Sequence, residues 1–113
     1  MKKLLPAVTL LPAALAAWGY SELTNFQLKE VSVPGPTCTI LHISDLHMLP
    51  GQKKKIEFVN SLADLRPDLV INTGDNLSDP KGLPGAIQAL TPLLQLPGAF
   101  CFGINDYFGP RLV

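Results

Sequence analysis

The sequence predicts an α/β fold in which strands and helices alternate along the chain. Three observations predict it: short apolar runs rich in β-forming residues, longer segments with apolar residues at helical spacing, and proline or glycine between them. The expected order is β-α-β-α-β with short connections, which is typical of a parallel sheet with right-handed crossovers.

The first 25 residues are interpreted as a separate apolar N-terminal helix, ahead of the α/β part in residues 26–113. Lys2 and Lys3 precede an uncharged stretch from Leu4 to Tyr20. A positive start followed by a short apolar run is typical of a signal peptide or a weak membrane anchor. We therefore expect a membrane-associated or exported protein. The alternative is an ordinary N-terminal helix, either buried or on the surface.

Four segments have the pattern of β-strands. Residues 26–33 alternate between apolar and polar side chains, which predicts a half-exposed strand ending at Pro34. Residues 37–44, 69–71 and 99–102 are more continuously apolar, which predicts strands covered on both faces. Cys38 and Cys101 fall in these runs and are expected to be small core residues.

Two segments have the pattern of helices. Residues 53–65 carry apolar side chains at helical spacing, and residues 83–96 do the same. Pro92 is expected to bend the last turn of the second helix. Lys53, Lys54 and Lys55, near the start of the first helix, are expected on a solvated face.

The composition excludes two broad classes of protein. Of the 113 residues, 47% are hydrophobic, enough to bury a core, so a disordered chain is excluded. Nine basic residues balance nine acidic ones, and this zero net charge predicts no nucleic-acid partner.

Polar clusters follow the expected strands at residues 44–47, 73–76 and 103–106. Asp45 and Asp75 are 30 residues apart, as are Asp75 and Asn105. One strand and one helix take about that many residues, so the clusters are expected at one edge of the sheet. In open parallel sheets this edge binds ligands.

The residue types in these clusters favour a metal site. Asp45 and His47 are two residues apart, so an extended backbone would point both side chains the same way. A carboxylate and an imidazole that converge form half of a metal site. Gly74 and Gly103 allow a sharp turn and a close approach to a ligand. Taken alone, Asp75 is equally compatible with a turn residue.

Three segments of the chain resemble the DxH, GDxx and GNH(D) blocks of the calcineurin-like metallophosphoesterases. They read LHISDLH at residues 41–47, PDLVINTGDN at 67–76 and GINDY at 103–107. The resemblance covers about residues 37–110, and bacterial members with an apolar N-terminal segment match best. It implies that the β-α-β-α-β unit is one layer of that family's αββα sandwich.

The resemblance also implies a reaction. In that family two metal ions, about 3.5–4 Å apart, hold a phosphate ester, and a water that they activate attacks phosphorus. Carried over by position, Asp45 and His47 would bind the first ion, Asp75 would bridge, and Asn105 would bind the second. The donors favour Mn, Fe or Zn. The expected substrate is a phosphomonoester, phosphodiester or pyrophosphate, either a small molecule or a lipid.

The third block departs from the family's Gly-Asn-His-Asp. If Asn105 is the ligand, Asp106 takes the position of the family's general-acid histidine. An alignment without a gap places Ile104 at the ligand position and Asn105 at that of the histidine. We favour the first alignment, because isoleucine cannot bind a metal. Asn76 is expected to hold the turn or to contact a substrate phosphate.

The family completes its site with later histidines, including a GHxH block, whereas this chain has only His42 and His47. His42 is expected to be packed or hydrogen-bonded rather than a ligand. We therefore expect the N-terminal half of a phosphoesterase domain, with one sheet face or edge poorly covered. Three alternatives remain open: an inactive fragment or weak metal-binding module, a hydrolase of a lipid-linked nucleotide-sugar pyrophosphate, and a nucleotide-binding module without metals. The third lacks a glycine-rich phosphate loop here.

Overall fold

The computed structural model describes residues 5–108, apart from the side chains of residues 5–10 and 108. The chain divides into two units, the first ending at Ser32 and the second beginning at Val33. The first unit contains helix α1 (Leu5–Thr24), which includes Pro12. No helix in the described part of the chain has both the length and the apolar character needed to cross a bilayer.

The expected strand over residues 26–33 is wrong. This segment has no regular secondary structure and is exposed almost throughout. Alternation of side chains favours a strand only when a neighbouring strand supplies hydrogen-bond partners. The described sheet consists of β1, β2 and β3 alone, and none of them pairs with this segment.

The second unit is the expected β-α-β-α-β layer, with all its strands parallel. Strands β1 (Ile40–Ile43), β2 (Leu69–Asn72) and β3 (Gly98–Phe100) lie in sequence order across one sheet. Helix α2 (Lys53–Ser61) connects the first two strands, and α3 (Leu83–Leu90) connects the second and third. The α/β fold class is therefore confirmed.

Each expected helix ends in a short 3₁₀ segment. Helix α2 continues into η1 (Leu62–Leu65), and α3 continues into η3 (Thr91–Gln95). Pro92 lies in the first turn of η3. Because proline has no N–H to donate to the preceding turn, the α-helical pattern ends there. The sequence predicts only a bend at this point.

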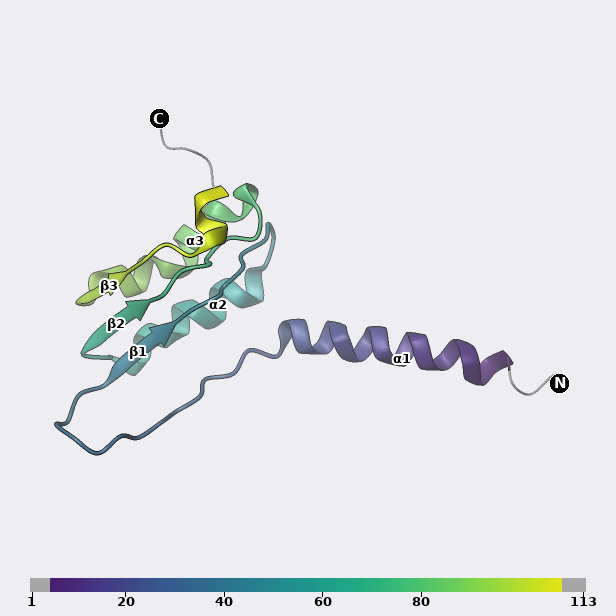
Figure 1. Ribbon diagram of the computed structural model, residues 1–113, viewed down its shortest axis with the longest axis horizontal. Helices are drawn as coiled ribbons and strands as arrows, with labels where there is room; N and C mark the ends of the chain where they lie inside the picture. The colour runs from purple at the N-terminus through teal and green to yellow at the C-terminus, as the bar shows by residue number, and fades with distance from the viewer. Residues whose placement is uncertain (1–4, 109–113) are drawn as a thin grey trace. The chain divides into compact units, whose positions relative to one another are not determined.

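The core lies between the sheet and its two helices, which pack against each other on one face of the sheet (Figure 1). Leu41 and Ile43 of β1 and Val70 of β2 point into this layer. They meet apolar side chains from α2–η1, from α3–η3 and from the loops after β1 and β2; these are Met48, Ile56, Val59, Leu62, Leu77, Ala86, Ala89 and Leu93.

The opposite sheet face and the β3 edge are exposed within the described residues. Ile40 of β1 is 56% exposed, and all three residues of β3 are exposed. The expectation of a poorly covered face is confirmed, whereas the expected burial of the third strand is wrong. Cys38 and Cys101 are also exposed, not core residues. The continuous apolar run at the third strand is typical of a strand that is covered on both faces. Helices α2 and α3, however, cover only one face of this sheet (Figure 1).

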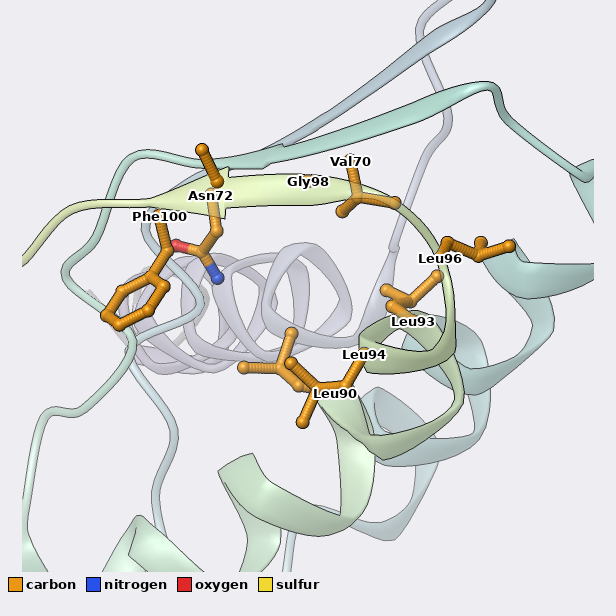
Figure 2. Close-up of a pocket in the computed structure, with 9 residues that line it drawn as sticks. Val70, Asn72, Leu90, Leu93, Leu94, Leu96, Gly98 and Phe100 are labelled. Carbon is orange, nitrogen blue, oxygen red and sulfur yellow. The ribbon is translucent and has the colours of Figure 1, made fainter.

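An apolar pocket lies between β3 and the α3–η3 segment, at the open edge of the sheet. Figure 2 shows aliphatic side chains on the helical side of this pocket and the Asn72 side chain extending from the sheet. The lining residues are Val70, Asn72, Leu90, Leu93, Leu94, Leu96, Gly98, Ala99 and Phe100. None of these side chains titrates, so the pocket offers no acid, base or metal ligand of its own.

Candidate metal centre

The loops that follow β1 and β2 run side by side because backbone hydrogen bonds continue beyond the strands. The N–H of Asp45 donates to Gly74 O at 2.9 Å, and that of His47 donates to Asp75 O at 3.0 Å. The N–H of Met48 donates to Asn76 O at 2.8 Å. These bonds hold the first two polar clusters at one edge of the sheet, as the sequence predicts.

The backbone at this edge is left-handed rather than extended. Among residues 5–108, positive φ occurs at four non-glycine residues: Asp45 (56°), His47 (44°), Asp75 (54°) and Arg66 (49°). Such conformations cost about 1–3 kcal/mol each and gather at functional sites. The expectation that an extended backbone aligns Asp45 with His47 is therefore wrong, and two left-handed residues bring them together instead.

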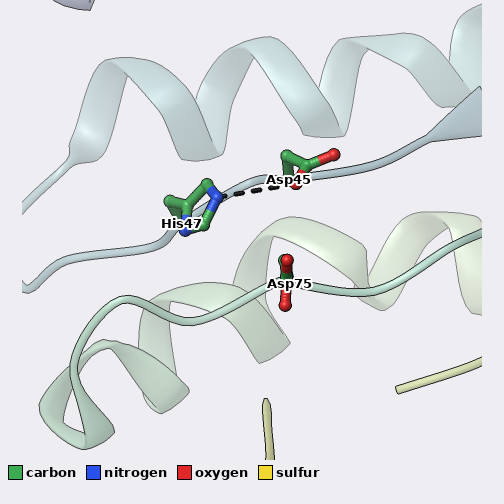
Figure 3. A group of neighbouring side chains, drawn as sticks. All are labelled: Asp45, His47 and Asp75. Carbon is green, nitrogen blue, oxygen red and sulfur yellow. Dashed lines mark ion pairs between the residues drawn. The ribbon is translucent and has the colours of Figure 1, made fainter. Parts of the chain in front are cut away.

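Asp45, His47 and Asp75 form a group that can hold a metal ion. One ligand atom from each lies within 4.8 Å of the others, and His47 Nε2 is 3.6 Å from Asp45 Oδ1 (Figure 3). Metal–nitrogen and metal–oxygen bonds are about 2.0–2.2 Å long, so ligands of one ion lie roughly 3–4 Å apart. The Asp45 side chain is exposed, while the other two are half-buried. The donor set therefore fits a divalent ion, and the 3.6 Å between His47 Nε2 and Asp45 Oδ1 lies within this range.

The loop after β3 lies close to this group because glycines occupy the points of closest approach, Gly74 after β2 and Gly103 after β3. A Cβ at Gly74, whose φ is 95°, would overlap the backbone N of Gly103. A Cβ at Gly103 would overlap both the backbone N and the carboxylate of Asp75. Only glycine at both positions lets the backbones approach this closely.

Because these two loops lie so close together, Asn105 contacts both Asp75 and His47. Its N–H donates to Asp75 Oδ1 at 2.9 Å, and its Nδ2 lies 3.3 Å from His47 Nδ1. Ile104, by contrast, is 76% exposed. The geometry therefore favours Asn105 over Ile104 as the residue of this loop that serves the site.

A sequence profile of calcineurin-like phosphoesterases matches residues 38–110, well over half of the chain. The chain belongs to the calcineurin-like phosphoesterase family. No curated protein and no solved structure matches it. Calcineurin-like phosphoesterases are hydrolases that use divalent metals, and the Asp45, His47 and Asp75 group is the candidate site for them in this chain.

Asp106, the predicted general acid, accepts hydrogen bonds from backbone N–H groups. Oδ1 accepts from the N–H groups of Asn76 at 2.8 Å and Leu77 at 3.3 Å, and Oδ2 accepts from Gly103 N–H at 3.0 Å. Both oxygens thus act as acceptors, as those of a carboxylate do. Its role as an acid stays a prediction, and these contacts favour a structural role.

Asn72, to which no sequence pattern assigns a role, contacts the second loop of the candidate site. It is buried, with 8% of its surface exposed, and its Oδ1 accepts from Gly74 N–H at 2.9 Å. Its Nδ2 donates to Asn76 Oδ1 at 2.9 Å. Asn72 is two residues after Val70, so both side chains point towards the core. A polar residue at a core-facing position next to a predicted site is the signal that could have identified it.

Lys55 supports the same loops from α2. Its Nζ donates to the carbonyl of Leu46, between Asp45 and His47, at 2.8 Å. Partial burial lowers the pKa of Lys55 below its usual value. Lys53 and Lys54 are exposed as expected, but the solvated position expected for Lys55 is wrong. Contact with the loop carbonyl compensates for its partial loss of solvent.

His42 lies outside the metal-binding group, as the sequence predicts. Its Nε2 is 2.8 Å from Thr73 Oγ1, across the exposed face of the sheet. The expected hydrogen bond is therefore present, although the side chain is exposed rather than packed.

Proposed function

We propose that this chain hydrolyses phosphomonoester, phosphodiester or pyrophosphate bonds with divalent metal ions held by Asp45, His47, Asp75 and Asn105. The observation that supports the proposal most is that Asp45, His47 and Asp75 each place a ligand atom within 4.8 Å of the others. These residues come from two different loops in a chain whose family is metal-dependent. Manganese, iron and zinc are the metals that suit the mixed carboxylate, imidazole and amide donors.

The chain's own residues hold the ions and orient the substrate. Asp45 and His47 supply a carboxylate and an imidazole from one loop, and Asp75 faces them from the next. Asn105 donates its N–H to Asp75 Oδ1, which orients that carboxylate. Divalent ions, when bound, stabilise the charge that develops on phosphoryl oxygens and generate a nucleophile from water at neutral pH.

Asn76 is suited to contact the phosphate group of the substrate. Its Oδ1 accepts from Asn72, so the orientation of the amide is fixed. An amide held by its oxygen presents its N–H groups as donors, which suit a phosphoryl oxygen. A lipid-like substrate and association with a membrane through residues 1–25 stay predictions of the sequence.

The test is hydrolysis of p-nitrophenyl phosphate and bis-p-nitrophenyl phosphate by the full chain with added Mn²⁺. We expect turnover that disappears with a chelator and is absent in the Asp75→Asn variant. Turnover that survives chelation, or that is equal in the variant, would contradict the proposal. Manganese binding without turnover of either ester would support the alternative of a weak metal-binding module.

A further inference from the structure

We infer that Asp106 is a positioning residue of the metal centre, which locks the loop after β3 onto the loop after β2. The expected effect of Asp106 on metal binding rests on the proposed function. The locking itself is a property of the chain without metal.

The two loops are joined by a reciprocal pair of contacts. Asp75 Oδ1 accepts from Asn105 N–H at 2.9 Å, and Asp106 Oδ1 accepts from Asn76 N–H at 2.8 Å. Each loop therefore contributes one carboxylate and one N–H, from adjacent residues. Because these are the residues proposed to bind metal or their direct neighbours, a shift of either loop moves the metal centre.

The second oxygen of Asp106 closes its own loop. Oδ2 accepts from Gly103 N–H at 3.0 Å, while Oδ1 also receives Leu77 N–H at 3.3 Å. Gly103 is the residue whose backbone lies against Asp75, with no room for a Cβ. One half-buried carboxylate thus fixes both the close approach at Gly103 and the path of the chain after Asp75.

Neither the Asp106 carboxylate nor its contacts need to touch substrate for this role. Partners that orient metal ligands typically change metal affinity by about 10- to 100-fold when they are removed. We therefore expect the loss of Asp106 to weaken Mn²⁺ binding before it weakens the fold.

Asp68 provides a matched control at the other end of the same sheet. Its Oδ2 accepts from Thr39 N–H at 2.7 Å, which ties the segments before β1 and β2. It is thus another carboxylate that joins distant backbone segments. It lies at the amino ends of the strands, away from the metal-binding group.

The experiment compares Asp106→Ala, Asp106→Asn and Asp68→Ala with the wild-type full chain. Mn²⁺ affinity is measured by calorimetry, and amide hydrogen exchange is measured without metal. We expect Asp106→Ala to lose about 10- to 100-fold in affinity and to exchange faster at Asn76, Leu77 and Gly103. Asp106→Asn keeps one acceptor oxygen, so it should lose less. Asp68→Ala should change neither quantity at the metal centre.

Wild-type affinity together with wild-type exchange in Asp106→Ala would overturn the inference. Equal losses of affinity in Asp106→Ala and Asp68→Ala would also overturn it, since both would then act through general stability. If Asp106→Ala does not fold, the same comparison is made with Asp106→Asn. If the wild-type chain binds no Mn²⁺, the proposed function fails, and exchange at the three amides alone decides whether Asp106 locks the loops.

Discussion

Asp75→Asn is expected to lower Mn²⁺ affinity by more than about 100-fold, beyond the usual effect of changing an outer partner of a metal ligand. Asp75 is the member of the group that comes from the second loop, so its replacement removes the carboxylate that this loop contributes. Asparagine keeps the shape of the side chain and an oxygen that can accept from Asn105 N–H. It also tolerates the φ of 54° at this position better than most residues.

Asp79→Asn serves as the matched control for this variant. Asp79 lies four residues further along the same loop, where its Oδ1 accepts from Lys81 N–H and caps η2 (Pro80–Gly82). Asparagine caps as well as aspartate does, so the fold should hold while the charge change is the same. Calorimetric titration with Mn²⁺ should give wild-type affinity for Asp79→Asn. Equal affinities for the two variants would contradict the assignment of Asp75.

Gly74→Ala is expected to lower the free energy of unfolding by about 2–5 kcal/mol. An alanine there must adopt a φ of 95°, and its Cβ must displace the backbone of Gly103. The left-handed conformation costs about 1–2 kcal/mol, and the steric displacement adds about 1–3 kcal/mol. Urea denaturation of the full chain measures the sum.

Gly51→Ala isolates the conformational part of that cost. Gly51 has a φ of 78°, but a Cβ there would meet nothing within 4 Å. We expect a loss of about 1–2 kcal/mol for this variant, from the backbone alone. Equal losses for Gly74→Ala and Gly51→Ala would show that the close approach of the loops contributes nothing.

The sequence predicts the sheet and the location of the site because both depend on short-range patterns. The apolar runs that contain Leu41, Val70 and Ala99 fall on strands β1, β2 and β3. A repeat of about one strand and one helix then brings the clusters at Asp45, Asp75 and Asn105 to the same edge. Residues 26–33 show the limit of such patterns, since alternation does not supply a pairing partner.

The details of the site depend on contacts that no local pattern encodes. The left-handed backbone at Asp45 and His47 is set by hydrogen bonds to the second loop, 29 and 28 residues further along the chain. The contacts of Asp106 and Lys55 likewise join separate segments. Cys101 is exposed because nothing among the described residues covers the β3 edge, and the apolar run around Cys101 does not reveal this.

The central claim is that a divalent ion binds among Asp45, His47, Asp75 and Asn105. The most direct measurement is NMR of the isotope-labelled full chain with substoichiometric Mn²⁺, which broadens amide signals near the ion. The strongest broadening is expected at residues 45–48, 74–77 and 103–107, falling towards Thr39 and Asp68 at the opposite ends of the strands. Broadening that is absent, or that is strongest around another acidic residue such as Asp64 or Glu57, would contradict the claim.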